Sequence, residues 1–258
     1  GPDQIAINDA GTFLWVTGSN NGSVTTYSIN GGTGLLTQGS KLTGFVHPLG
    51  IAVDSTNSIV YIADNGAGLV YSFSINSTNG ALTQIGSPVQ DIGGPGGGPG
   101  FISIDPGFNF IYVTDLTFGV LSVLATNSGA LLFSSIQPAG ATANMPIGVG
   151  FAVLSNANFV FAANQGDSTL WSFQLTGPGN PQIPVAFGSG DVSAPTGLVV
   201  DPQNAFLYTT NQTTGTVSQF SLNPTCSGAV GPPCFVQSVA TESPHNASSG
   251  PFGITLAQ

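Results

Sequence analysis

Hydrophobic residues alternate with polar or small residues along short segments of this 258-residue chain, and glycine and proline fall between the segments. Such alternation predicts β-strands, and no stretch shows the 3.6-residue period of an amphipathic helix. In LVYSFSI (69–75), for example, large apolar residues alternate with Ser72 and Ser74, which predicts one buried and one wetter face.

A longer pattern repeats five times. The clearest segments recur at intervals of 46 to 51 residues: FLWVTG (13–18), IVYIAD (59–64), FIYVTD (110–115), FVFAAN (159–164) and FLYTTN (206–211). A polar turn and another strand follow each of them: SVTTYSI (23–29), LVYSFSI (69–75), VLSVLAT (120–126), TLWSFQL (169–175) and TVSQFSL (216–222). A more variable fourth strand comes next, as in LLTQGSKL (35–42) and ALTQIGSPV (81–89). Short apolar strands open the repeats: IAI (5–7), IAV (51–53), ISI (102–104), FAV (151–153), LVV (198–200) and ITL (254–256).

Four strands per unit of this length are typical of a β-propeller blade. We therefore predict an all-β fold, a β-propeller of four-stranded antiparallel blades in a single domain over residues 1–258. The expected blades span approximately 1–45, 46–94, 95–144, 145–193 and 194–251. Residues 252–258 then supply the first strand of a sixth blade. We expect 252–257 to pair with another strand of the same molecule or of a neighbour, because an unpaired apolar edge invites association.

The motifs GIAVD with IVYIAD, and ISIDPGFNFIYVTD, resemble those of the lactonase-like, YVTN-type β-propeller superfamily. The resemblance covers nearly the whole chain through the five repeats. It implies a propeller fold and, for the enzymes of that group, activity on lactones of sugar acids or on cyclic muconate-type acids.

The charge composition changes the functional expectation. Eleven acidic residues face one basic residue, Lys41, which gives a net charge of -10. Such a surface repels nucleic acids and anionic membranes. An anionic lactone or its enolate requires a cationic group or a metal ion, and the chain has no arginine. No G-x-S-x-G nucleophile motif occurs either. These features favour a protein without enzymatic activity.

The two cysteines, Cys226 and Cys234, flank a loop rich in glycine and proline. Their pattern favours a disulfide in an oxidising compartment, with two reduced thiols as the alternative. We therefore expect an extracellular or cell-surface location. No apolar run reaches the 18 residues of a membrane-spanning helix.

Several titratable residues fall in the connections that lead from one repeat to the next. They are candidate ligand-binding residues of the axial face, with solvated loop residues as the alternative: His47, Asp91, Asp191, Glu242 and His245. No paired ligand spacing accompanies them, so no metal ion or other cofactor is expected. The run GGPGGGPG (93–100) is expected to be a blade connection, because it lacks the ending of a phosphate-binding loop.

Polar residues at the strand ends are expected to accept hydrogen bonds from turn N–H groups. They are Asp54, Asp105 and Asp201 after first strands, and Asp64, Asp115, Asn164 and Asn211 after second strands. Calcium binding by the repeated carboxylates after first strands is the alternative, although no D-x-D-x-D-G loop supplies the further oxygens.

Together these features predict a non-catalytic extracellular propeller that acts as a structural, surface or self-assembling subunit. Its partners would be further copies of the chain, other surface proteins or glycans. Two alternatives stay open: a glycan- or small-ligand-binding module that uses the axial face, and a degenerate lactonase-like hydrolase.

Overall fold

A computed structural model describes residues 1–222 except 57, 93, 106, 108, 139–144, 155–156, 183–184 and 189, together with the backbone of 237–238 and 245–246. The chain divides into two compact units, residues 1–117 with 122–135, and residues 118–121 with 136–258. Among the described residues, no helix is long and apolar enough to cross a membrane.

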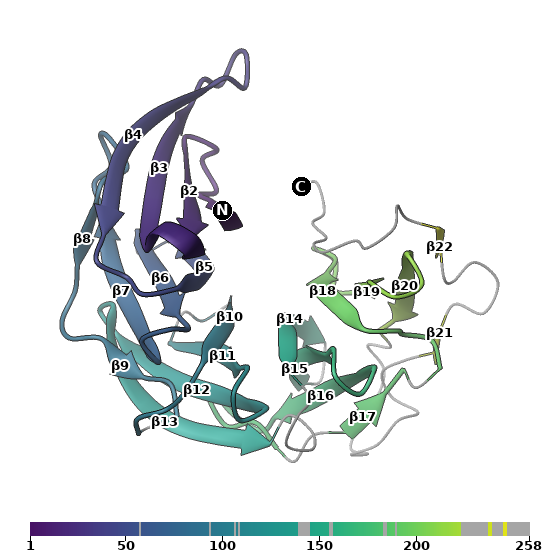
Figure 1. Ribbon diagram of the computed structural model, residues 1–258. Coiled ribbons are helices and arrows are strands. Elements are labelled where there is room, and N and C mark those ends of the chain that lie inside the picture. The colour runs from purple at the N-terminus through teal and green to yellow at the C-terminus, as the bar shows by residue number, and fades with distance from the viewer. Residues whose placement is uncertain are drawn as a thin grey trace. The chain divides into compact units, whose positions relative to one another are not determined.

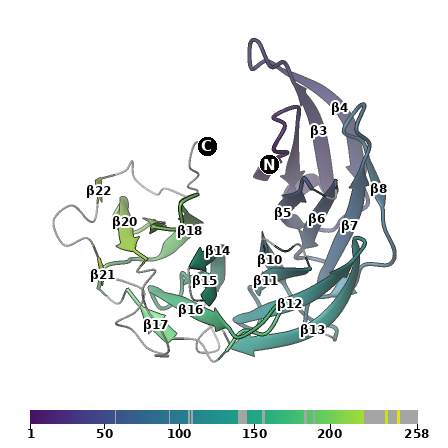
Figure 2. The same ribbon diagram turned by 180° about the vertical axis from the view of Figure 1, so that it is seen from behind.

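The described residues form five sheets in which consecutive strands pair antiparallel, drawn in Figure 1 and from behind in Figure 2. The first two sheets contain β1 (Pro2–Ile7), β2 (Phe13–Gly18), β3 (Ser23–Ile29) and β4 (Leu36–Thr43), then β5 (Pro48–Asp54), β6 (Ile59–Asp64), β7 (Leu69–Ile75), β8 (Leu82–Gln84) and β9 (Val89–Gln90). The third contains β10 (Pro99–Ile104), β11 (Phe110–Asp115), β12 (Val120–Asn127) and β13 (Ala130–Pro138). The last two contain β14 (Pro146–Leu154), β15 (Ala157–Asn164), β16 (Thr169–Leu175) and β17 (Val185–Phe187), then β18 (Pro195–Val200), β19 (Phe206–Asn211), β20 (Thr216–Ser221), β21 (Gln237–Ser238) and β22 (His245–Asn246). One 3-10 turn, η1 (Ser19–Asn21), joins β2 to β3.

These sheets confirm the predicted fold class, four-stranded antiparallel blades of a β-propeller, five in number among the described residues. The second strands were predicted with the same bounds in four blades, and in the fourth blade β15 begins two residues earlier. The expected extra strand at 252–258 lies outside the described residues.

Two details of the strand prediction are wrong. The expected fourth strand at 81–89 is two short pieces, β8 and β9, separated by a bend at Gly86 with φ of 62°. The predicted wet face of β7 fails at Ser72, which is buried and donates a hydrogen bond to the carbonyl of Ile85. The segment that follows β8 therefore covers this face of β7.

A proline begins the first strand of every blade and lies opposite the last residue of the second strand. The five pairs are Pro2 with Gly18, Pro48 with Asp64, Pro99 with Asp115, Pro146 with Asn164, and Pro195 with Asn211. The register shifts directly after each proline. The first residue of a strand tolerates proline, because proline has no N–H and no ladder hydrogen bond needs one at this position.

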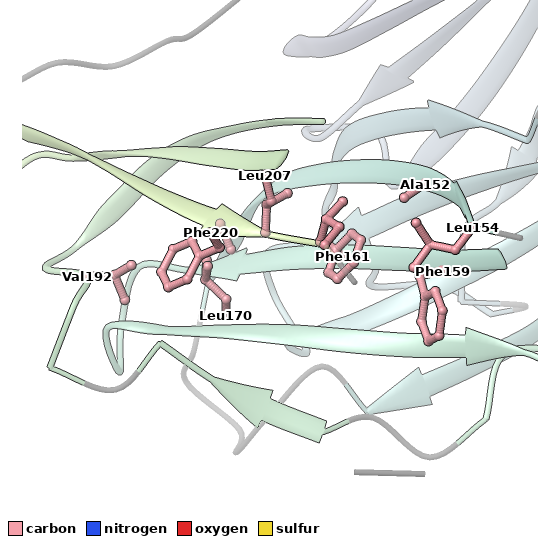
Figure 3. Close-up of a cluster of buried hydrophobic side chains, with 10 residues drawn as sticks. Ala152, Leu154, Phe159, Phe161, Leu170, Val192, Leu207 and Phe220 are labelled. Atoms are coloured by element: carbon pink, nitrogen blue, oxygen red, sulfur yellow. The ribbon is translucent and has the colours of Figure 1, made fainter. Parts of the chain in front are cut away.

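Apolar side chains between neighbouring blades form the cores. In the first unit, Trp15 of β2 is fully buried and packs in one cluster with Ile62 and Phe73 of the second blade. In the second unit, Figure 3 shows Val192, Leu170 and Phe220 at one end of a cluster and Phe159, Leu154 and Ala152 at the other. Each blade therefore buries its strands against the next one within its unit.

Candidate functional site

A set of hydrogen bonds fixes the backbone of the connection that leads into the first strand of a blade. In three blades, the side chain of the last residue of the second strand accepts backbone N–H groups from the residues directly before the proline; we call this arrangement the strand-end latch. The pairs are Val46 and His47 with Asp64, at 2.8 and 2.7 Å, Gly98 with Asp115, at 2.6 Å, and Ser193 with Asn211, at 3.0 Å. The latch fixes the backbone of the connections that carry the candidate residues.

The same carboxylates also accept hydrogen bonds from the turn that follows them, as predicted. The N–H of Ala67 lies 3.3 Å from Asp64, and that of Thr117 lies 2.8 Å from Asp115. Asp201 likewise accepts the N–H of Ala205 at 2.7 Å. The sequence therefore revealed the turn bonds, whereas it missed the latch because the donors lie 17 or 18 residues earlier in the chain.

His47 is a half-buried imidazole on a fixed backbone. Its N–H donates to Asp64, and its carbonyl accepts the N–H of Asn65 at 3.1 Å. Gly66 lies against the base of the side chain, since a Cβ at that glycine would be 2.9 Å from the Cβ of His47. The backbone that carries the histidine ring is thus fixed by two hydrogen bonds, which suits a group that must meet a ligand in a set position.

Asp91 and Asp115 form a pair of buried carboxyl groups between the second and third blades. Both residues have 0% exposure. Asp91 directly follows β9, whose Gln90 pairs with Leu69 of β7, so the second blade holds it. A Cβ placed on Gly97 would lie 2.1 Å from Oδ1 of Asp91 and 3.0 Å from Oδ2 of Asp115. The two side chains therefore face the same point of the connection that enters β10.

The electrostatics of this pair are unusual. Burial and the neighbouring Asp115 raise the pKa of Asp91 from 3.8 to about 8, although the backbone N–H groups of Asp91 and Ile92 oppose the shift. Neither oxygen of Asp91 receives a hydrogen bond of ordinary geometry. Two ionised carboxylates at such close range repel each other in a poorly hydrated site. Without a cation, Asp91 therefore keeps its proton at neutral pH.

The remaining predicted site residues are only partly described. Asp191 is exposed, and its backbone carbonyl accepts a hydrogen bond from the hydroxyl of Ser218. His245 lies in β22 and pairs with Val217 through its backbone. Glu242, Cys226 and Cys234 lie outside the described residues, so the predicted disulfide stays a prediction. The structure thus brings Asp91 together with Asp115, a residue that the sequence had suggested only for a turn.

The described part of the chain holds no group of three or more histidine, cysteine or acidic side chains that could bind a metal ion. The single lysine, Lys41, is exposed on the outer strand β4. The titratable side chains described at these connections are therefore the half-buried His47, the exposed Asp191 and the buried pair of Asp91 and Asp115.

A sequence model of the family described as "Lactonase, 7-bladed beta-propeller" matches residues 13–143 and 44–232 of this chain. The chain belongs to the lactonase β-propeller family. No curated protein sequence matches this lactonase-family chain.

Solved structures agree at the level of the fold. A protein from Lactobacillus plantarum has a TM-score of 0.75 at 18% identity, over 98% of this chain and 73% of its own. A Bacteroides fragilis protein, provisionally named a 6-phosphogluconolactonase, has a TM-score of 0.77 at 14% identity, over 98% and 72%. The periplasmic gluconolactonase of Pseudomonas aeruginosa has a TM-score of 0.53 at 16% identity, over 95% and 87%.

The family match corrects the main functional prediction. The non-catalytic, structural or self-assembling subunit expected from the sequence is wrong, and the lactonase-like alternative fits the findings better. The error has a physical origin: a shortage of cationic side chains bears on the binding of anionic substrates, whereas the prediction took it to exclude enzymatic activity altogether.

Proposed function

We propose that this protein hydrolyses the ring ester of an uncharged lactone. Membership of the lactonase family is the observation that carries the proposal. The fold is also similar to that of proteins named for gluconolactone chemistry, one of them a periplasmic gluconolactonase.

The charge of the chain selects the class of lactone. A phosphorylated or carboxylated lactone is an anion, and a net charge of -10 repels it. No arginine is present to hold such an anion, and Lys41 lies exposed on an outer strand. An uncharged sugar lactone needs hydrogen bonds instead, and hydroxyl, amide and backbone groups are abundant here.

His47 is the residue that we assign as the general base. Hydrolysis of an ester needs a group that removes a proton from the attacking water, and histidine is the side chain that does this most often. His47 is the histidine whose side chain the structure describes, and Asp64 and Asn65 fix its backbone. Asp91 and Asp115 are fully buried, so a substrate does not reach them in this arrangement.

The test is a panel of lactones with the wild-type protein and two variants. We expect wild type to hydrolyse glucono-δ-lactone faster than its spontaneous hydrolysis, and to prefer it at least about tenfold over 6-phosphogluconolactone in kcat/KM. His47→Gln should lower kcat by about 10²- to 10⁴-fold, the usual contribution of a general base. Titration in a pH-stat of the carboxylic acid that hydrolysis releases measures both effects.

Lys41→Gln is the matched control, since it removes the one cationic side chain. It should leave kcat and KM for the uncharged lactone unchanged. Spontaneous rates across the whole panel would contradict the proposed activity. A preference for the phosphorylated lactone would contradict the proposed substrate class, and full activity of His47→Gln would remove His47 from its role.

A further inference from the structure

The carboxyl pair between the second and third blades carries an inference that does not depend on lactone hydrolysis. Asp91 is fully buried, yet neither of its oxygens receives a hydrogen bond of ordinary geometry. Other strand-end carboxylates of the chain, such as Asp64 and Asp201, each accept several backbone N–H groups. Asp91 therefore lacks the well-formed backbone N–H bonds that stabilise Asp64 and Asp201, although the N–H groups of Asp91 and Ile92 lie near it.

No lysine or arginine side chain is available to compensate the charge of the pair. Lys41 is the single lysine or arginine in the sequence, and it is exposed in β4 of the first blade. A buried carboxylate normally pairs with a cation or coordinates a metal ion. A cation from the solvent can supply this positive charge.

The placement of the oxygens suits one shared ion. Oδ1 of Asp91 and Oδ2 of Asp115 lie within 2.1 and 3.0 Å of the point that a Gly97 Cβ would occupy. Two oxygens that share one calcium ion lie at most about 5 Å apart, because each calcium–oxygen bond is about 2.3–2.6 Å long. The two carboxylates satisfy this limit without a change in the fold.

The surrounding chain can supply further ligands. The connection over residues 94–100 is poor in side chains, and a Cβ on Gly94 would meet nothing within 4 Å. Such a backbone can turn carbonyl oxygens toward an ion and leave room for water. Calcium accepts six to eight oxygen ligands in flexible geometry, including carbonyls and water, whereas magnesium demands a near-ideal octahedron.

We propose that Asp91 and Asp115 bind a calcium ion that links the second blade to the third. The ion lies beside Gly97 and occupies the space between the two carboxylates. Because Asp91 belongs to the second blade and Asp115 to the third, the bound ion stabilises the first compact unit.

The experiment is a calcium titration of protein freed of metal with EDTA and then desalted, at constant ionic strength. Isothermal calorimetry should give one site per chain, and the thermal midpoint should rise by about 5 °C at a hundredfold excess over Kd. Asp91→Asn should lose the calcium-dependent rise and the calorimetric site. This variant is expected to fold, since Asp91 accepts no hydrogen bond of ordinary geometry that the asparagine would lose.

Asp9→Asn is the matched control, because Asp9 is an exposed aspartate whose replacement changes the net charge equally. It should bind calcium as wild type does, and magnesium should bind wild type at least about tenfold more weakly than calcium. Absence of saturable binding to wild type up to about 10 mM calcium, beyond the weakest calcium modules, overturns the proposal and leaves a pair that shares a proton. Equal binding by wild type and Asp91→Asn overturns it as well.

Discussion

Gly97 shows how one missing side chain sets the geometry of the carboxyl pair. A Cβ at this position would collide with Oδ1 of Asp91 at 2.1 Å and crowd Oδ2 of Asp115 at 3.0 Å. Both carboxylates are buried, so neither can swing into solvent to make room. Glycine is therefore required here for space.

We expect Gly97→Ala to lower the free energy of unfolding by about 1–3 kcal/mol, the usual cost of inserting an atom group into a packed site. Gly94→Ala, in the same connection, should change it by less than about 0.5 kcal/mol because its Cβ meets nothing within 4 Å. Urea unfolding of both variants measures the difference. Equal stability of the two variants would show that the carboxylates are not held as described.

The sequence indicated which single residues could have a role in a connection, but it did not indicate which residues they contact. Asp91 was a candidate because it lies in a connection, and Asp115 was expected only to serve a turn. Their contact depends on the path of a glycine-rich segment between two blades. That segment has no hydrophobic period, so the sequence pattern could not predict where it runs.

Trp15 joins two elements that are distant in sequence. Its ring is fully buried in β2, and its Nε1–H donates to the carbonyl of Gly80, which follows β7, at 2.9 Å. Its complete burial places this tryptophan in the core and leaves no ring face for a sugar to stack on. Blades one and two are thus connected by a hydrogen bond as well as by apolar contact.

Trp15→Phe should lower the free energy of unfolding by about 2–3 kcal/mol. The variant leaves the buried carbonyl of Gly80 with only the longer hydrogen bond from the Thr26 hydroxyl, at 3.4 Å, and opens a small cavity. Trp171→Phe is the comparison, since Trp171 is half-buried and donates only to the nearby Thr169. It should cost less than about 1 kcal/mol in the same urea experiment, and an equal loss in both would contradict the role of the Gly80 bond.

Strand positions were predictable because they depend on local alternation and turn residues. Four of the five second strands have the predicted bounds. The fourth strand of the second blade was not predicted correctly, since Gly86 bends the backbone between β8 and β9. The burial of Ser72 was also missed. The segment at Ile85 covers this serine, and the alternation of residues within 69–75 gives no information about that segment.

The charge of the whole molecule acts on its stability. With a net charge of -10 and one lysine, the folded chain repels itself more strongly than the expanded chain does. Raising NaCl from about 10 to 150 mM shortens the Debye length from about 30 to 8 Å. We expect the thermal midpoint at pH 7 to rise by a few degrees over this range.

The same salt series near pH 4.1, the isoelectric point of the sequence, is the control. The net charge is then close to zero, so the salt-dependent rise should disappear. A thermal midpoint at pH 7 that stays constant or falls with NaCl would contradict this account. Calorimetry or circular dichroism at the two pH values measures it.

At the level of the molecule, the repeats predicted the propeller and the family, whereas composition gave the wrong main function. Periodicity reports directly on packing, which is common to all members of a fold. Catalytic chemistry depends on a few side chains, and the absence of cationic ones restricts the substrate without deciding whether a reaction occurs.

The strand-end latch has a consequence for the history of the fold. In each blade that has it, donor and acceptor lie 17 or 18 residues apart, between the entry of the first strand and the end of the second. A gene segment that encodes one blade therefore also encodes the bonds that secure it. Tandem duplication of such a segment adds a blade that is already fastened, and later mutations are free to diversify the connections around it.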